Sequence, residues 1–164
     1  MENEFVCCFS GPRPQKLPWG YNESDNRCIE MKNKIKEEIS NAVKKGYSIF
    51  ISGMALGFDI MCAESVLELK NIFPHIKLYC ALPCKNQERL WRAIDKERYK
   101  NILSHSDSIK YINEFYTGAK CMFERNQFMV DNSSLLIALY YGLSGGTKNT
   151  IEYAEKQKLN IVLL

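Results

Sequence analysis

The sequence predicts an α/β protein, a Rossmann-like three-layer α/β/α sandwich around a mainly parallel sheet of about six strands. Two observations lead to this class. Short apolar runs alternate with longer helical patterns from one end of the chain to the other, which is typical of repeated βα units. The chain also has 164 residues, of which 46% are hydrophobic and 25% charged, as expected for one folded domain. We therefore treat residues 1–164 as a single domain.

The apolar runs give the expected strands and the periodic segments the expected helices. Strands are predicted at residues 5–9, 47–52, 76–82, 107–112, 134–140 and 160–164. Helices are predicted at residues 27–45, 60–72, 86–104, 120–132 and 147–157. Gly46 suits the C′ position that ends the first helix, and Pro74 stops the second. Right-handed crossovers place the loops that follow the strands at one edge of the sheet, where ligands of such sheets bind.

Charge and composition limit the partners and the compartment. The formal net charge is +3, and the positive residues are spread along the chain, which argues against nucleic acid as a partner. No apolar stretch is long enough to span a membrane, and the acidic start Met1–Phe5 is unlike a signal peptide. We expect a cytoplasmic protein that does not enter membranes.

The cysteines are expected to be reduced and mostly buried. There are seven, an odd number, and four of them lie inside apolar runs. No C-x-x-C pair is present, and His75 and His105 are isolated, so the spacing of a zinc site is missing. We expect neither a metal nor a resident cofactor.

Two glycine-rich turns follow expected strands and precede expected helices. In IFISGMALGFD, residues 49–59, Gly53 and Gly57 would let a phosphate approach the unpaired amides of a helix start. The alternative is that these glycines only permit a tight turn and close helix packing. Asp59 could bind a ribose hydroxyl or simply complement the positive end of the helix.

The second turn repeats the arrangement in LLIALYYGLSGGTKNT, residues 135–150. Its candidate ligand residues are Ser144, Gly145, Gly146 and Thr147, and Thr147 is expected to be both helix N-cap and phosphate donor. Because both turns fall on the same edge of the sheet, we expect one shared anion pocket.

Two further segments add polar side chains to that edge. In the loop FSGPRPQKLPWG, Ser10 and Gly11 precede Arg13, whose planar fork suits phosphate, although a solvated arginine is an equal alternative. In the helix CMFERNQFMVD, Arg125 lies at the edge of an apolar face and Asn126 lies inside it. Such a pair needs partners, either a ligand phosphate or ribose, or else a buried carboxylate or backbone carbonyl.

The remaining aromatic and apolar positions have less specific interpretations. Gln87 and Trp91 would share a helix face, where Trp91 could stack on a base but more commonly would belong to the core or an interface. The apolar helix face at residues 122–130 and Trp91 could pair across a two-fold axis, so a homo-oligomer is expected.

Four strings together resemble the YpsA-like family of the SLOG superfamily: CCFSGPRPQKLPWGY, ISGMALGFDIMCAE, ALPCKNQERLW and MFERNQFMVDNSSLLIALYYGLSGGTKNTIEYA. That superfamily groups DprA, which binds single-stranded DNA, with LOG phosphoribohydrolases and sensors of nucleotide-derived messengers. The resemblance implies a Rossmann-like pocket for nucleotides and their derivatives. SGMALGFD resembles the SG-x-A-x-G-x-D motif of DprA, which carries over to Ser52, Gly53, Ala55, Gly57 and Asp59.

The chain departs from the LOG enzymes where they need a carboxylate. Met122 and Arg125 match their M-x-x-R-K helix, but Asn126 replaces the lysine. Thr150 occupies the position of the glutamate in their glycine-rich turn. Glycosidic cleavage needs that carboxylate, so a catalytic role is doubtful and no catalytic residue is assigned. The family string G-H-R-P corresponds to G-P-R-P at residues 11–14 here, so Pro12 replaces its histidine.

The leading hypothesis is a protein that binds a small phosphate-bearing nucleotide derivative, of the nucleotide, NAD or ADP-ribose type, as a sensor or sequestering protein. One alternative is an N-glycosidase or phosphoribohydrolase of the LOG type that acts on nucleoside monophosphates with Glu64, Glu124 or Glu152. A second alternative, ranked last, is a DprA-like accessory protein that binds single-stranded DNA, because no concentrated basic surface with interleaved aromatic residues is evident.

Overall fold

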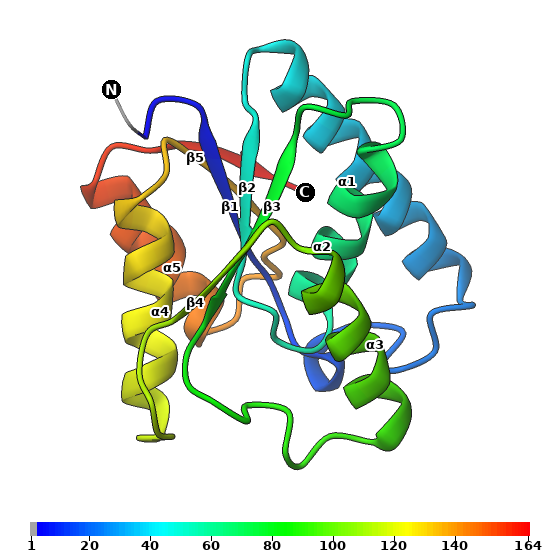
Figure 1. Ribbon diagram of the computed structural model, residues 1–164, viewed down its shortest axis with the longest axis vertical. Helices are drawn as coiled ribbons and strands as arrows, with labels where there is room; N and C mark the ends of the chain where they lie inside the picture. The colour runs from blue at the N-terminus through cyan, green and yellow to red at the C-terminus, as the bar shows by residue number, and fades with distance from the viewer. Residues whose placement is uncertain (1–2) are drawn as a thin grey trace.

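A six-stranded sheet lies between two layers of helices in the computed structural model, which describes residues 3–164 (Figure 1). Residues 1 and 2 of the acidic start lie outside this range. The strands are β1 (Val6–Ser10), β2 (Ile49–Ser52), β3 (Lys77–Leu82), β4 (Ser108–Tyr111), β5 (Leu135–Ala138) and β6 (Asn160–Leu163). The helices are α1 (Asn26–Lys44), α2 (Phe58–Leu69), α3 (Ala93–His105), α4 (Ala119–Asp131) and α5 (Gly146–Lys156), with a 3-10 helix η1 (Pro14–Lys16).

The strand order places a topological switch point at the first strand. The order is β4-β3-β2-β1-β5-β6, and every neighbouring pair is parallel. The helices α1, α2 and α3 cover one face of the sheet and α4 and α5 cover the other (Figure 1). The chain therefore reverses its direction of winding between β1 and β5, and ligands of such sheets bind outside the carboxyl ends of the strands at this point.

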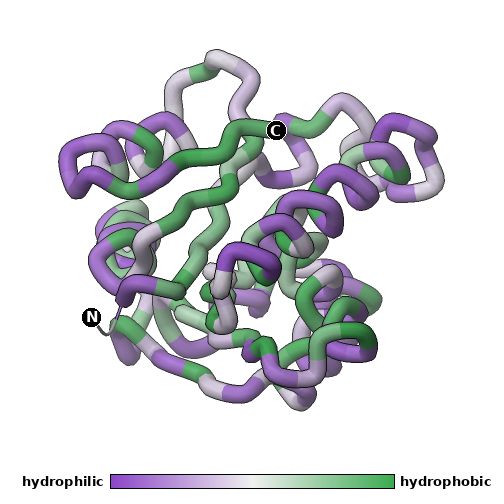
Figure 2. The backbone as a smooth tube through the Cα atoms, turned by 90° about the horizontal axis from the view of Figure 1, so that it is seen from above, coloured by the Kyte–Doolittle hydropathy of each residue, from purple (hydrophilic) through white to green (hydrophobic). Residues whose placement is uncertain are grey.

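The core forms on both faces of β1, whose five residues are all buried. Cys7 and Phe9 pack into the cluster under α1 and α2, whereas Val6 and Cys8 pack into the cluster under α4 and α5. The tube in Figure 2 shows the apolar strands between more hydrophilic helices. All seven cysteines are buried, free thiols, which confirms that expectation.

The expected elements agree with the structure except before α3. The predicted helix over 86–104 is wrong at its start, because α3 begins only at Ala93. Asn86 has a φ of +59°, which is incompatible with a helix, and the backbone bonds from Arg89 to Asn86 and from Trp91 to Glu88 close turns. Gln87 and Trp91 consequently do not share a helix face. Gly46 does follow the C-cap Lys45 with a φ of +102°.

Part of the apolar surface that suggested an oligomer is used within the chain. Met129 and Val130 of α4 are buried against the sheet. Trp91 packs edge-to-face on Tyr99, with 5.1 Å between the ring centroids. Phe123 on the same helix is 46% exposed, so the homo-oligomer stays a prediction. Among residues 3–164 no helix is long and apolar enough to cross a membrane.

Candidate functional site

The loop after β1 covers the start of α2. Gly57 has a φ of +92°, and a Cβ at this position would lie 2.6 Å from the carbonyl oxygen of Pro12. That same oxygen accepts a hydrogen bond of 3.1 Å from the amide of Phe58, the first residue of α2. A Cβ at Gly11 would collide with the Phe58 ring at 2.3 Å. These glycines allow the loop after β1 to pack against the start of α2, where the carbonyl oxygen of Pro12 accepts from the first helical amide.

The first glycine turn is held by its own hydrogen bonds. Ser52 Oγ donates to the carbonyl of Asp59 at 3.0 Å and accepts from the amide of Met54 at 3.1 Å. Asp59 Oδ2 accepts from the amide of Ala55 at 3.3 Å. Burial raises the pKa of Asp59, and the charges of Arg125 and Arg13 oppose that rise. Asp59 is only 7% exposed and is engaged inside the turn, which favours its structural interpretation, and ribose binding by Asp59 stays a prediction.

Arg125 of α4 also binds this turn. Its side chain is 3% exposed, and Nη1 donates to the carbonyl of Gly53. Its Nε donates to Asn126 Oδ1 at 2.8 Å. A Cβ at Gly53 would lie 2.6 Å from Nη1, so this glycine makes room for the guanidinium. Burial lowers the pKa of Arg125, while the charge of Asp59 raises it. Of the two expected partners, the backbone carbonyl is the one observed.

The second glycine turn is open. The helix α5 begins at Gly146 with Gly145 as N-cap, and no side chain caps it, so Thr147 as N-cap is a wrong prediction. Ser144, Gly145, Gly146 and Thr147 line a small cavity of about 40 Å³ together with Pro12 and Lys16. Lys16 Nζ lies 3.1 Å from the place of a Cβ at Gly145. An uncapped helix start beside an ammonium group favours an anion.

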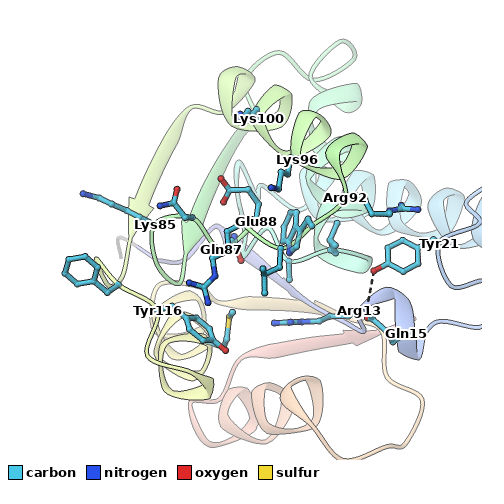
Figure 3. Close-up of a pocket in the computed structure, with 18 of the residues that line it drawn as sticks. Arg13, Gln15, Tyr21, Lys85, Gln87, Glu88, Arg92, Lys96, Lys100 and Tyr116 are labelled. Carbon is cyan, nitrogen blue, oxygen red and sulfur yellow. Dashed lines mark hydrogen bonds between the residues drawn. The ribbon is translucent and has the colours of Figure 1, made fainter.

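A much larger cavity of about 1060 Å³ opens beside the first turn (Figure 3). Its walls come from the loop after β1, the first glycine turn, the connections β3–α3 and β4–α4, and the exposed side of α3. The cationic residues among its lining are Arg13, Lys85, Arg89, Arg92, Lys96 and Lys100. Its aromatic residues are Tyr21, Trp91, Phe115 and Tyr116, and its carboxylates are Glu88 and Glu114.

Most of these cations lack a carboxylate partner in the described part of the chain. Within the described part of the chain, no carboxylate forms an ion pair with Arg13, Arg89, Lys96 or Lys100. Lys85 Nζ lies 3.5 Å from Glu114, and both side chains are more than half exposed. The cavity therefore presents a positive field that a ligand with several phosphates would neutralise.

The structure separates the two glycine turns. Ala55 and Arg13 line the large cavity, whereas the turn at 144–147 lines the small one. Pro12 and Lys16 belong to the small cavity, and Arg13 and Gln15 to the large one, so this loop divides them. The expectation of one shared anion pocket is therefore corrected to two cavities on either side of one loop. Ser10, the last residue of β1, and Gly11, which follows it, line neither cavity.

Sequence reasoning missed most of the basic wall. In KNQERLWRAIDKERYK, residues 85–100, six of the sixteen residues are basic, and this local density of positive charge is the signal that could have indicated the wall. Lys16, three positions after Arg13, was missed as well. The statement that basic and aromatic residues do not gather was wrong, because the fold brings them together from four segments.

The carboxylates considered for the hydrolase alternative lie outside both cavities. Glu64 pairs with Arg98, Glu124 accepts from Asn113 at 2.9 Å, and Glu152 lies 3.8 Å from Lys148. Thr150 is buried, and its Oγ1 donates to the carbonyl of Gly146 within α5 at 2.8 Å. None of these side chains is placed to act on a ligand in either cavity.

The all-parallel sheet with its switch point at β1 defines a Rossmann-like α/β protein, and a basic, aromatic cavity lies at the carboxyl edge of this sheet. The chain belongs to the YspA SLOG family, whose model (YpsA) matches residues 7–163.

Several relatives support this membership. The chain is 34% identical over 144 residues to the SPbeta prophage-derived protein YoqJ of Bacillus subtilis, which covers 80% of this chain and 84% of the relative. It is 31% identical over 121 residues to a UPF0398 protein of Brevibacillus brevis, covering 73% of this chain and 64% of the relative.

Two solved structures share the fold. The DNA processing protein A of Helicobacter pylori, described with a single-stranded DNA binding mode, superposes with a TM-score of 0.62 at 17% identity. That of Streptococcus pneumoniae gives a TM-score of 0.65 at 12% identity. The alignments cover 97% and 96% of this chain but only 64% and 49% of the two DprA chains.

Proposed function

We propose that this protein binds a phosphate-bearing nucleotide derivative in the large cavity and acts as a sensor or sequestering protein. The observation that carries the proposal is the group of cations without carboxylate partners, Arg13, Arg89, Lys96 and Lys100, beside exposed aromatic rings. Arginine binds phosphate through parallel hydrogen bonds, and aromatic rings stack on bases. Arg13 takes the role of phosphate ligand, and Arg125 and Asp59 shape the turn beneath it.

The open start of α5 is a candidate for a further phosphate. The amides of the first turn of α5 and the ammonium of Lys16 surround the small cavity. Its volume of about 40 Å³ leaves room for a phosphate at its mouth but not for a base.

Single-stranded DNA is the second candidate ligand, and two observations favour it over the hydrolase alternative. The cavity combines cations and aromatic rings, the combination that strand-binding proteins use. The fold is also that of DprA.

The test is a thermal-shift panel of ADP, NAD, ADP-ribose and a short oligothymidylate, each at rising concentration. Binding at a hundred times the dissociation constant raises the free energy of unfolding by about 2.7 kcal/mol. Arg13→Met should weaken binding, whereas Lys120→Met on α4, outside both cavities, should not. No shift with any ligand would refute the proposal. Release of free base from nucleoside monophosphates or NAD would instead support the hydrolase alternative.

A further inference from the structure

Two arginine–tyrosine pairs mark opposite ends of the large cavity. The guanidinium carbon of Arg92 lies 4.1 Å from the centroid of the Tyr21 ring. The guanidinium carbon of Arg89 lies 5.4 Å from the centroid of the Tyr116 ring. In Figure 3, Tyr21 and Tyr116 lie on opposite sides of the cavity with Arg13 between them. Each pair combines the two planar groups on which a base stacks best.

The pair at Tyr21 is fixed before any ligand binds. Gln15 Nε2 donates to the Tyr21 hydroxyl at 3.2 Å, which holds the ring from one side. Arg92 donates from Nε and Nη2 to both carboxylate oxygens of Asp95, at 2.6 and 3.1 Å. Asp95 is itself only 5% exposed, so this fork is anchored in the first turn of α3. A fixed stacking surface costs a ligand little ordering entropy.

The pair at Tyr116 joins two connections that lie far apart in sequence. The amide of Lys85 donates to the carbonyl of Glu114 at 3.3 Å, which ties the β3–α3 connection to the β4–α4 connection. Tyr116 is 54% exposed and its neighbour Phe115 is 74% exposed. Because much of the apolar surface of these two rings is exposed to solvent, a ligand that stacks on them can bury it and gain binding free energy.

Cations without carboxylate partners line the same cavity as the two arginine–tyrosine pairs. Arg13, Lys96 and Lys100 line the cavity without carboxylate partners. The volume of about 1060 Å³ lies just above the range of roughly 300–1,000 Å³ that is usual for small-molecule and cofactor cavities. Because Tyr21 and Tyr116 lie on opposite sides of this cavity, a base stacked on one pair leaves the other pair free (Figure 3).

We propose that the ligand carries two bases joined through phosphates, with one base against Tyr21 and Arg92, the other against Tyr116 and Arg89, and the phosphates at Arg13, Lys96 and Lys100. This inference rests on the function proposed above and adds the number of bases to it. A dinucleotide joined by pyrophosphate and a short strand joined by phosphodiesters share this chemistry.

The experiment compares one-base and two-base ligands by calorimetry. NAD is measured against ADP, which has a pyrophosphate but one base, and the dinucleotide pdTpdT against dTMP. A second stacked base should tighten binding by about five- to hundredfold. A gain only in the NAD arm identifies the pyrophosphate-linked source, and a gain only in the pdTpdT arm identifies the strand.

The variants Tyr21→Leu and Tyr116→Leu locate the bases. Each should remove most of the two-base gain, and only one of them should weaken the one-base ligand. Tyr111→Leu, an exposed tyrosine of β4 outside the cavity, should leave both affinities unchanged. Thermal melting confirms that the variants fold. One-base ligands that bind as tightly as two-base ligands, or a two-base gain that survives both variants, overturn this inference and leave the proposed function intact. No binding by any ligand overturns both.

Discussion

Arg125 shows how a functional motif residue can serve the scaffold. Its guanidinium is buried and donates to the carbonyl of Gly53, which lies 72 positions earlier in the chain. It therefore fixes the turn that forms one wall of the large cavity. The same residue type at Arg13 is exposed and has no such partner.

Replacing Arg125 should cost stability before it affects binding. Arg125→Met leaves the Gly53 carbonyl and the Asp59 carboxylate without their buried counterpart, so we expect a loss of about 1–3 kcal/mol in the free energy of unfolding. Urea denaturation measures it. Lys120→Met, on the same helix but with a side chain that is 77% exposed, is the matched control and should change stability much less. Equal effects of the two substitutions would argue against the scaffold role.

The glycines provide a second prediction at this scale. Gly57→Ala introduces a Cβ 2.6 Å from the Pro12 carbonyl oxygen at a φ of +92°, so it should destabilise the protein by at least about 1 kcal/mol. At Gly146 a Cβ meets no atom within 4 Å, and Gly146→Ala should leave stability unchanged or raise it by up to about 1 kcal/mol. Thermal denaturation of both variants, side by side, checks the contrast. A stable Gly57→Ala variant would contradict the packing described for the loop after β1.

Among the elements, the long connection between β1 and α1 depends on a cluster of charges. Glu23 accepts from Arg98 Nη2 of α3 at 2.9 Å and pairs with Lys32 of α1 at 2.7 Å. Arg98 also binds Glu64 of α2. One loop is thereby held to three helices, which positions Tyr21 at the cavity.

This cluster should make stability depend on pH. Burial alone would raise the pKa of Glu23, but the hydrogen bonds from Arg98 and Lys32 outweigh it and bring the pKa below the ordinary value of 4.5. The stabilisation is therefore complete above that value and is lost as the pH falls through the lower pKa of the folded state. Glu23→Gln should be less stable than the natural protein at neutral pH, and the difference should shrink between roughly pH 5 and 3. A difference that stays constant over this range would contradict it.

The sequence predicted the elements better than the site, for physical reasons. Apolar periodicity is local, so β1 and β5 and most helices could be located within one or two residues. Asn86 adopts a left-handed backbone that no periodicity reveals, and the start of α3 was misplaced. Arg125 donates to Gly53, and Lys16 lies beside Gly145, but both pairs are far apart in sequence. Only the fold therefore shows that Arg125 is buried and that Lys16 lies at the second glycine turn.

For the whole molecule, the uneven distribution of charge matters more than the net value. A formal charge of +3 suggested no polyanion, yet six cations and two carboxylates line one cavity. Net charge averages over the surface, whereas a ligand responds to the local field within about a Debye length of 8–10 Å.

The single sheet predicts one cooperative unfolding transition. Trp19 and Trp91 both pack on the same core cluster, and six strands share one hydrogen-bonded sheet. Urea unfolding followed by tryptophan fluorescence and by far-ultraviolet circular dichroism should therefore give one midpoint, with a slope of about 1–3 kcal/mol per molar. Two separated midpoints would show that residues 1–164 do not behave as one domain.

The central place of β1 has a consequence during synthesis. Its residues leave the ribosome before those of the other strands, and β2 supplies one neighbour within about fifty residues. The other neighbour, β5, begins only at Leu135. Until then this fully buried strand has one bare backbone edge, which is a template for pairing with other chains. Nascent or truncated chains that end before Leu135 should therefore depend on chaperones and aggregate without them.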